Sequence, residues 1–337
     1  MPIAYEAVTA AIPRQALRGA VIGLGMIGRH HARLLQTSPD VDFVGAVDPD
    51  GDRFGAVHDP AKVFASAGEL PEVDFAIVAV PTESHLDAVR TMAARGAHLL
   101  IEKPLASTSP EAQQVIDVVR ESGVRAAVGH VERFNPALIE LRRRFGELGE
   151  VLLIRTERVG PFPDRVKDVG VVKDLGTHDL DLVRWLGQSP VASLAAQTGH
   201  VMGRDHEDLV LVTGRLASGV AFSCNVDWIS PTKVRRTRVL GDRGMFEADT
   251  LTADLTLFRN GEQSTAPWLQ QQRGVTEGDM TRFAIAKPEP LGSELLAVLA
   301  MVRGEDCAVV TLEEGLETVR VAEAVLESAR TGETVHL

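Results

Sequence analysis

The stretch GLGMIG, residues 23–28, places three glycines in a G-x-G-x-x-G spacing directly after an apolar run and ahead of a helix-like segment. The first glycine permits a tight turn, the second lets the backbone approach a pyrophosphate, and the third lets a helix pack closely on the strand. The helix N-terminus also offers partial positive charge to phosphates. A lone triplet could still be a plain strand–helix turn, so its surroundings decide what it indicates.

Those surroundings favour a dinucleotide site. From residue 18 to about 130, short apolar runs alternate with helix-like segments, as in a parallel sheet covered on both faces. The runs are residues 20–25, 42–48, 62–66, 74–80, 97–104 and 125–131. The second run ends at Asp48, where a carboxylate accepts hydrogen bonds from ribose hydroxyls and repels a 2′-phosphate. This predicts NAD as the cofactor, although Arg53 lies near enough in sequence to leave NADP open.

After about residue 134 the apolar runs become longer and closer to alternating. Residues 150–160, 208–228, 232–242 and 244–261 predict an open sheet, antiparallel or mixed, and 291–303 and 312–330 predict helices. We therefore expect an α/β protein. A doubly wound Rossmann domain covers residues 16–131, an α/β domain with a large, open, mostly antiparallel sheet covers 132–337, and residues 1–15 form a loose leader.

Composition excludes several classes of function. The 337 residues include 35 basic and 47 acidic side chains, a net charge of −12, which argues against a nucleic-acid or membrane-surface partner. No apolar run approaches the length needed to span a bilayer. The only cysteines, Cys224 and Cys307, lack a metal-binding spacing, so we expect no metal and a reduced, cytoplasmic setting.

Ligands of doubly wound sheets bind beyond the carboxyl ends of the strands. The cofactor contacts expected there are Gly23, Gly25, Met26, Ile27, Gly28, Asp48, Pro81, Thr82, His85, Glu102 and Lys103. His85 could equally begin a helix without a chemical role. Lys103 precedes a proline that stiffens its backbone, and near a nicotinamide it could stabilise a developing alkoxide. His130 and Asn135 follow the sixth run at the same edge.

The segment KDLGTHDLDLVRWLG, residues 173–187, raises a separate question. A helix beginning near Gly176 would place His178 and Asp181 on one face, while the leucines at 175, 182 and 186 pack on another side. The pattern alone also fits a solvated stripe with an arbitrary histidine. Oxidation of an alcohol, however, needs a base whose pKa lies near neutrality, and Asp174 could orient the imidazole or bind a sugar hydroxyl.

The motifs GLGMIGRHHARLL, VPTESH, EKPLA, DLGTHDLD and the final VAEAVLESARTGETVHL resemble the Gfo/Idh/MocA oxidoreductases, relatives of glucose–fructose oxidoreductase and inositol dehydrogenase. The resemblance covers nearly the whole chain after residue 18. It implies that Lys103, Asp174 and His178 are catalytic. It also implies a homodimer or homotetramer formed through the open sheet of the second domain.

A narrower resemblance, carried by VGHVERFNPA, RVGPFPDRVKDVGVVKDLGTHD and WISPTKVRRTRV, is to nucleotide-sugar 3-dehydrogenases acting on UDP-N-acetylglucosamine. It implies hydride transfer between nicotinamide and the C3 hydroxyl of a UDP-N-acetylhexosamine. Arginines would attract its diphosphate. The substrate contacts expected are Arg133, Asn135, Arg158, Arg165, Asp174 and His178. The alternatives are a dehydrogenase of a free sugar or cyclitol such as inositol, and an inactive dinucleotide-sensing regulator. Whether Lys103 or His178 accepts the proton also stays open.

Overall fold

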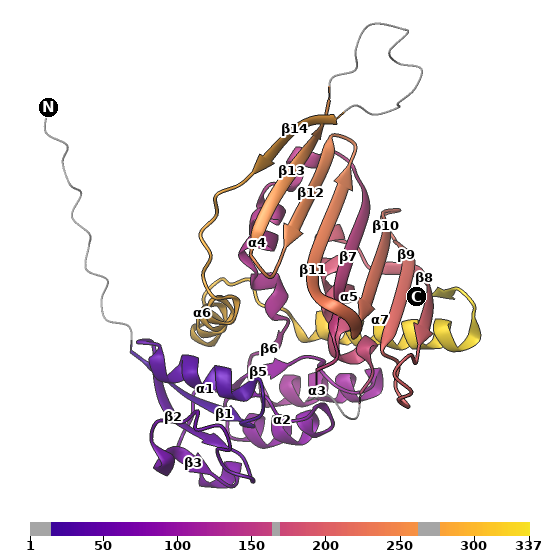
Figure 1. Cartoon of the computed structure of the whole chain (residues 1–337). Helices are drawn as coiled ribbons and strands as arrows, with labels where there is room; N and C mark the ends of the chain where they lie inside the picture. The colour runs from indigo at the N-terminus through magenta and orange to yellow at the C-terminus, as the bar shows by residue number, and fades with distance from the viewer. Residues whose placement is uncertain (1–14, 164–168, 262–276) are drawn as a thin grey trace, which may run out of the picture.

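The computed structural model describes residues 15–163, 169–261 and 277–337, and the predicted leader lies almost wholly outside them. Two sheets and seven α-helices organise these residues (Figure 1). The strands are β1 (Leu17–Ile22), β2 (Val41–Val47), β3 (Val63–Phe64), β4 (Phe75–Val78), β5 (His98–Glu102), β6 (Ala126–Gly129), β7 (Val151–Pro161), β8 (Val191–Gly199), β9 (Leu209–Leu216), β10 (Ala221–Asp227), β11 (Ile229–Gly241), β12 (Gly244–Asp249), β13 (Asp254–Asn260), β14 (Glu277–Arg282) and β15 (Val335–His336). The helices are α1 (Gly28–Thr37), α2 (His85–Ala94), α3 (Ser109–Ser122), α4 (Pro136–Arg143), α5 (Thr177–Gly187), α6 (Pro290–Arg303) and α7 (Leu312–Thr331).

The first sheet has the order β3-β2-β1-β4-β5-β6, and every pairing in it is parallel. This is the doubly wound order of a Rossmann domain, with the change of direction between β1 and β4. Each of the six predicted runs overlaps a strand of this sheet, so the predicted architecture is confirmed. Residues of β4 are buried throughout, as expected for a strand covered on both faces.

Helices cover both faces of the first sheet. One core contains residues of α2, α3 and the first half of α7, and the other contains residues of α1 and α6. In α6, Leu295, Val298 and Leu299 are buried in the same cluster as Val21 of β1. The boundary predicted between residues 131 and 132 stays a prediction, but α6 belongs by packing to the first sheet.

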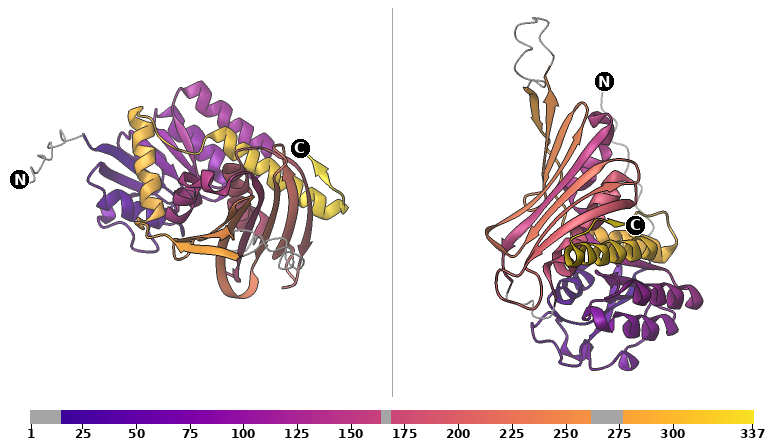
Figure 2. Two further views of the ribbon diagram at one scale, coloured as in Figure 1. Left: turned by 90° about the horizontal axis from the view of Figure 1, so that it is seen from above. Right: turned by 90° about the vertical axis from the view of Figure 1, so that its right-hand side faces the viewer.

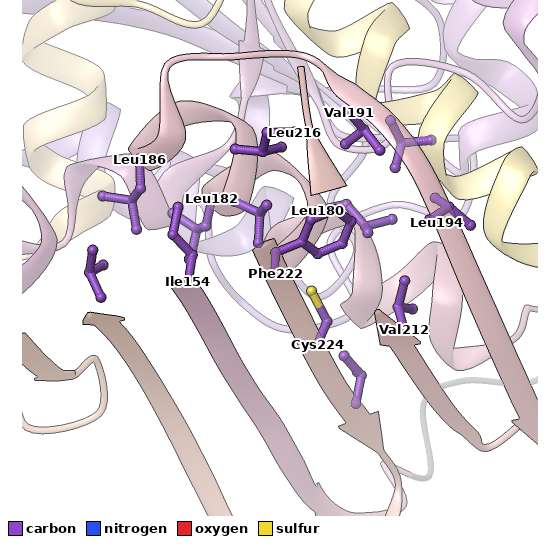
Figure 3. Packing of buried hydrophobic residues seen from close by; sticks show 14 of the residues in the cluster. Ile154, Leu180, Leu182, Leu186, Val191, Leu194, Val212, Leu216, Phe222 and Cys224 are labelled. Atoms are coloured by element: carbon purple, nitrogen blue, oxygen red, sulfur yellow. The ribbon is translucent and has the colours of Figure 1, made fainter. Parts of the chain in front are cut away.

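The second sheet has the order β14-β13-β12-β11-β7-β10-β9-β8-β15. Only β7 and β10 pair in parallel, so the predicted open and mostly antiparallel sheet is confirmed. Its core lies between one face and the helices α4, α5 and α7, where Ile154, Leu182 and Phe222 pack together (Figure 3). Helix α7 lies between this sheet and the first domain (Figure 2).

Three strands of the second sheet were not predicted: β8, β14 and β15. In β14 all six residues are exposed, so no apolar alternation marks it. In β8 small alanines stand at several positions where larger apolar side chains would signal a strand. Among the described residues, no helix is both long and apolar enough to cross a membrane.

Candidate active site

The glycine turn joins β1 to α1 as the sequence predicts. Gly23 has φ +98°, and a Cβ there would lie 2.6 Å from the Ala79 carbonyl oxygen. A Cβ on Gly28 would lie 1.9 Å from the Gly23 oxygen, so helix and turn pack as closely as glycine allows. In contrast, a Cβ on Gly25 would meet nothing within 4 Å. The open space at Gly25 fits a pyrophosphate against the backbone.

Asp48 stands beside this turn at the end of β2. Its Oδ2 accepts a 2.8 Å hydrogen bond from the Leu24 amide, and its Oδ1 accepts one of 3.0 Å from the Asp50 amide. A carboxylate has about four lone-pair positions, so these bonds fix its orientation and leave capacity for ribose hydroxyls. Met26 and Ile27 are exposed at the tip of the turn, where a bound dinucleotide would cover them.

Lys103 follows β5, and a cis peptide bond joins it to Pro104. Its ammonium crosses to the second domain, where it donates a 2.7 Å hydrogen bond to the main-chain oxygen of Asp174. The Asp174 carboxylate lies 3.4 Å from the same nitrogen. Both side chains are largely buried, at 16% and 10% exposure. The two residues therefore connect the strand ends of the first sheet to the segment that precedes α5.

His178 lies in the first turn of α5, next to a π-helical turn, η6 (Val172–Gly176). The helix predicted to begin near Gly176 is thus observed, and π-helical turns are frequent at functional sites. The Nδ1 atom of His178 is buried, with no hydrogen-bond partner among the described residues. Burial, followed by the positive charges of Lys103 and Arg158, lowers the pKa of His178 well below its usual value. The imidazole is therefore neutral at neutral pH.

Arg158 and Arg235 add positive charge around His178. Arg158 is buried, and carboxylates hold its guanidinium: Nε lies 2.6 Å from Asp179 and Nη1 2.9 Å from Glu132. Arg235 donates hydrogen bonds to the main-chain oxygens of residues 159 and 234, and burial lowers its pKa to about 10. Sequence reasoning missed Arg235, for which the basic run KVRRTRV was the available signal.

Comparison with known proteins agrees with this arrangement over both domains. Residues 17–130 match the family model described as "Oxidoreductase family, NAD-binding Rossmann fold", and residues 144–337 match "Oxidoreductase family, C-terminal alpha/beta domain". The chain belongs to the Gfo/Idh/MocA oxidoreductase family. It has an NAD-binding Rossmann domain, and the family contains oxidoreductase enzymes. The predicted family membership is confirmed.

Named members of the Gfo/Idh/MocA family show a range of related activities. The chain is 29% identical over 274 residues to a UDP-N-acetylglucosamine 3-dehydrogenase of Acidithiobacillus ferrooxidans, covering 80% of this chain and 85% of that protein. It is 30% identical over 332 residues to the myo-inositol dehydrogenase Hyg17 of Streptomyces leeuwenhoekii, covering 93% and 97%. The solved structure of the first of these dehydrogenases has a TM-score of 0.83 at 24% identity, covering 94% and 99%, which shows a shared fold.

Several residues that we expected to contact the cofactor bond other groups of the protein in the structure. Both ring nitrogens of the buried His85 lie near main-chain oxygens, those of Leu105 and Val80, which supports the alternative of a residue without a chemical role, while its cofactor contact stays a prediction. The carboxylate of Glu102 lies 2.7 Å from the buried His31 and points inward. It also accepts a hydrogen bond from the Lys103 amide, so it positions Lys103. Pro81 and Thr82 lie at the expected edge, directly after β4.

Two residues that we expected to contact the substrate, Arg133 and Asn135, also bond other residues of the protein. Arg133 donates two hydrogen bonds to the buried Asp181 and one to Glu314, so carboxylates of this protein balance its charge. The Asn135 side chain bonds the Thr250 oxygen and caps α4. Arg158 is held in ion pairs with Glu132 and Asp179, and its contact with a substrate stays a prediction. Arg165 lies outside the described residues.

His130 has a place in the site that the predicted set of contacts did not include. Glu102 and Gly129 are register partners in β5 and β6, so Lys103 and His130 follow at adjacent strand ends. His130 is 1% exposed, and neither ring nitrogen has a hydrogen-bond partner among the described residues. Its Nδ1 lies 3.8 Å from Asp181. Burial lowers its pKa, although Asp181 acts in the opposite direction. A neutral imidazole therefore lies beside the catalytic candidate Lys103.

The described residues contain no group of three or more histidine, cysteine, aspartate or glutamate side chains arranged to hold a metal ion. The side chains that the structure brings together are the ammonium of Lys103, the neutral imidazole of His178 and the carboxylate of Asp174.

Proposed function

We propose that this oxidoreductase transfers a hydride between NAD and a secondary alcohol of a sugar, the C3 hydroxyl of a UDP-N-acetylhexosamine. The observation that carries the proposal is the convergence of Lys103 and His178 from different domains. Lys103 bonds Asp174 directly, and its charge is the main influence on the pKa of His178 after burial. An ammonium beside a neutral imidazole suits oxidation of an alcohol, which loses a proton from oxygen as a hydride leaves carbon.

In the proposed reaction, Lys103, His178 and Asp174 have different roles. Bound NAD would supply the two-electron acceptor. The ammonium of Lys103 donates a hydrogen bond to the substrate oxygen and stabilises the negative charge that develops there. The imidazole of His178 takes the hydroxyl proton: its Nδ1 has no partner among the described residues, and its lowered pKa keeps the ring unprotonated while making it a weaker base than the near-neutral one expected from sequence. Asp174 holds Lys103 in position. In the reverse direction, the same imidazole returns the proton.

NAD rather than NADP is the proposed cofactor because of Asp48. Its carboxylate is held beside the glycine turn by two main-chain amides. A 2′-phosphate placed there would meet a fixed negative charge. Arg53, the residue that left NADP open, forms a 3.5 Å ion pair with Asp50.

The nucleotide-sugar assignment is supported by the named UDP-N-acetylglucosamine 3-dehydrogenase and by the local motifs around His130 and Arg235. The second candidate, a cyclitol dehydrogenase, is supported by the likeness to Hyg17 over nearly the whole of both chains. Arg235 bonds main-chain oxygens rather than a carboxylate, and the positive charge that it adds near His178 favours an anionic substrate over a neutral polyol.

A substrate panel tests the assignment. Reduction of NAD is followed by absorbance with UDP-N-acetylglucosamine, UDP-N-acetylgalactosamine, free N-acetylglucosamine and myo-inositol, and each is repeated with NADP. We expect turnover with a UDP-sugar and none with the free sugars. Turnover with myo-inositol alone would establish the cyclitol candidate instead. NAD binding by calorimetry without turnover on any substrate would indicate a regulator.

We also propose that copies of the chain associate through the face of the second sheet that carries no helix (Figure 2). Leu211 lies between the buried Val210 and Val212, so it projects from this face, and it is 44% exposed. Light scattering of the wild type should give a dimer or tetramer mass, and Leu211→Asp should lower it. Leu251→Asp, at an exposed leucine in a turn, is the control. A monomeric wild type would contradict the proposal.

A further inference from the structure

A separate cavity of about 310 Å³ lies at the C-terminal end of α5. Its lining combines cationic, aromatic and hydroxyl side chains. The residues are Arg133, Arg142, Arg184, Trp185, Gln188, Ser189, Pro190 and Glu314. Arg184 and Trp185 lie about two helical turns beyond His178, roughly 10 Å along the helix. The cavity is therefore distinct from the space between Lys103 and His178.

The three arginines differ in how closely carboxylates pair with them. Arg133 is fully paired with Asp181 and Glu314. Arg142 forms no ion pair with any described residue, and its only hydrogen bond among them is a long one of 3.3 Å to the Leu186 oxygen. Arg184 bonds a main-chain oxygen and a threonine hydroxyl, while its Nε is buried without a partner in the part of the chain that the structure describes. These two guanidiniums keep donors that an anion would satisfy.

The electrostatics agree with this geometry. The pKa of Arg142 is lowered by burial and by the charge of Arg133, and burial also lowers the pKa of Arg184. Both guanidiniums thus lie where positive charge is disfavoured. Asp181, Glu317 and Glu314 act in the opposite direction on Arg184, so Arg142 is the guanidinium of this cavity whose charge is least balanced.

The remaining residues of the lining make the cavity suitable for a compact anion. The guanidinium of Arg142 stacks over Trp185 at 5.6 Å and over Phe145 at 5.8 Å, which holds the charge in place. Ser189 accepts a hydrogen bond from the Ser218 amide, which leaves its own hydroxyl hydrogen to donate. Planar guanidiniums bind phosphate or carboxylate oxygens in pairs.

We propose that this cavity is a binding site for a small anion bearing a phosphate group, held by Arg142 and Arg184. The proposal does not depend on the chemistry at Lys103, because no catalytic candidate lines the cavity. Inorganic phosphate and a small phosphate monoester share the chemistry that the two guanidiniums recognise.

The test titrates inorganic phosphate into the full-length protein saturated with NAD, so that the glycine turn is already occupied. Sodium chloride keeps the ionic strength constant. Calorimetry measures binding, and tryptophan fluorescence follows it, with Trp185→Phe identifying the responding indole. We expect one saturable site per chain that weakens at least tenfold in Arg142→Gln. Arg143→Gln is the matched control on α4, because Arg143 pairs with Glu140 on the surface.

Two further arms make the test decisive. In the first, glycerol 3-phosphate or malonate replaces inorganic phosphate. Tighter binding of glycerol 3-phosphate would identify an organic phosphate monoester as the ligand. Tighter binding of malonate would overturn the phosphate assignment. Crystals soaked in selenate should show anomalous scattering within the cavity, a measurement that needs no variant. Absence of saturable binding in the wild type, or equal binding by Arg142→Gln, would overturn the proposal.

Discussion

Lys103 and Asp174, which lie in different domains, are joined by a 2.7 Å hydrogen bond from an ammonium to a main-chain oxygen. This bond places the end of β5 against the turn that leads into α5. The position of Lys103 relative to His178 therefore depends on main-chain geometry in the second domain as well as on the first sheet. Substitutions in this region should change the rate more than they change cofactor affinity.

Removal of either catalytic candidate tests that expectation. Lys103→Met and His178→Ala should each lower kcat by about a hundredfold or more, because a charge-stabilising donor or a proton acceptor is lost. NAD affinity, measured by fluorescence titration, should stay close to the wild-type value. Lys287→Met is the control, since Lys287 pairs with Asp254 far from the site. A variant with wild-type turnover would remove its residue from the mechanism.

The protonation of His178 can be measured directly. Its pKa is lowered, so the neutral ring should persist as the pH falls through 6.5, and protonation should appear only at more acidic pH. Ring ¹⁵N resonances of labelled histidine, assigned with His178→Gln, report this transition. The exposed His336 supplies an internal comparison. Protonation of His178 at pH 6.5 or above would contradict the role of neutral base.

Asp48→Asn tests cofactor choice. The amide keeps the shape and one acceptor for the Leu24 amide, but it removes the charge that repels a 2′-phosphate. The ratio of kcat/KM for NAD to that for NADP should fall by about tenfold or more, which corresponds to about 1.4 kcal/mol. Asp87→Asn, at an exposed position on α2, should leave the ratio unchanged. An unaltered ratio in Asp48→Asn would place the discrimination elsewhere.

Arg133→Met should destabilise the fold strongly. Asp181 is 1% exposed, and removal of its bidentate partner would leave a buried charge unpaired, at a cost of about 3–5 kcal/mol. Urea unfolding measures the loss. The double variant Arg133→Met with Asp181→Leu should recover part of it, because neither charge then remains buried. If the single variant is as stable as wild type, Asp181 has another partner.

The buried carboxyl group of Glu294 should make the stability of the fold depend on pH. It is 1% exposed, both carboxylate oxygens lack partners among the described residues, and burial followed by Glu102 raises its pKa well above its usual value. The folded state therefore holds this proton more tightly than the unfolded state does, so its contribution to stability is lost as the pH rises.

Glu294→Gln, a neutral replacement of the same shape, should flatten the fall in Tm between about pH 5 and pH 9. Thermal melts at a series of pH values measure it. Glu313→Gln, at an exposed position on α7, is the control. Parallel pH profiles for the wild type and Glu294→Gln would show that Glu294 is ionised in the folded protein.

The first domain could be predicted from sequence because each of its signals is local. Buried parallel strands give short apolar runs, and the glycine turn identifies the first strand and helix together. The second domain was predicted less completely. Its inner strands alternate clearly, whereas β14 is exposed throughout and carries no pattern. The packing of α6 on the first sheet depends on contacts with residues far away in sequence, such as Val21, which no local pattern records.

The candidate site residues also differed in how well the sequence could predict their contacts. Lys103, Asp174 and Gly23 were placed by motifs, and the structure brings Lys103 and Asp174 together. Arg133 and Asn135 were chosen for residue type and nearness in sequence. Their partners, Asp181 and the Thr250 oxygen, come from segments whose proximity only the fold reveals. A guanidinium available to a ligand and one neutralised inside a core look identical in a sequence.

The return of α6 to the first sheet makes that domain discontinuous along the chain. A fragment ending near residue 131 would lack Leu295, Val298 and Leu299, and the face of the sheet around Val21 would be left bare to water. Neither lobe is thus a module that a single cut could release. Swapping the cofactor-binding half between related enzymes would require transplanting two separate stretches of polypeptide.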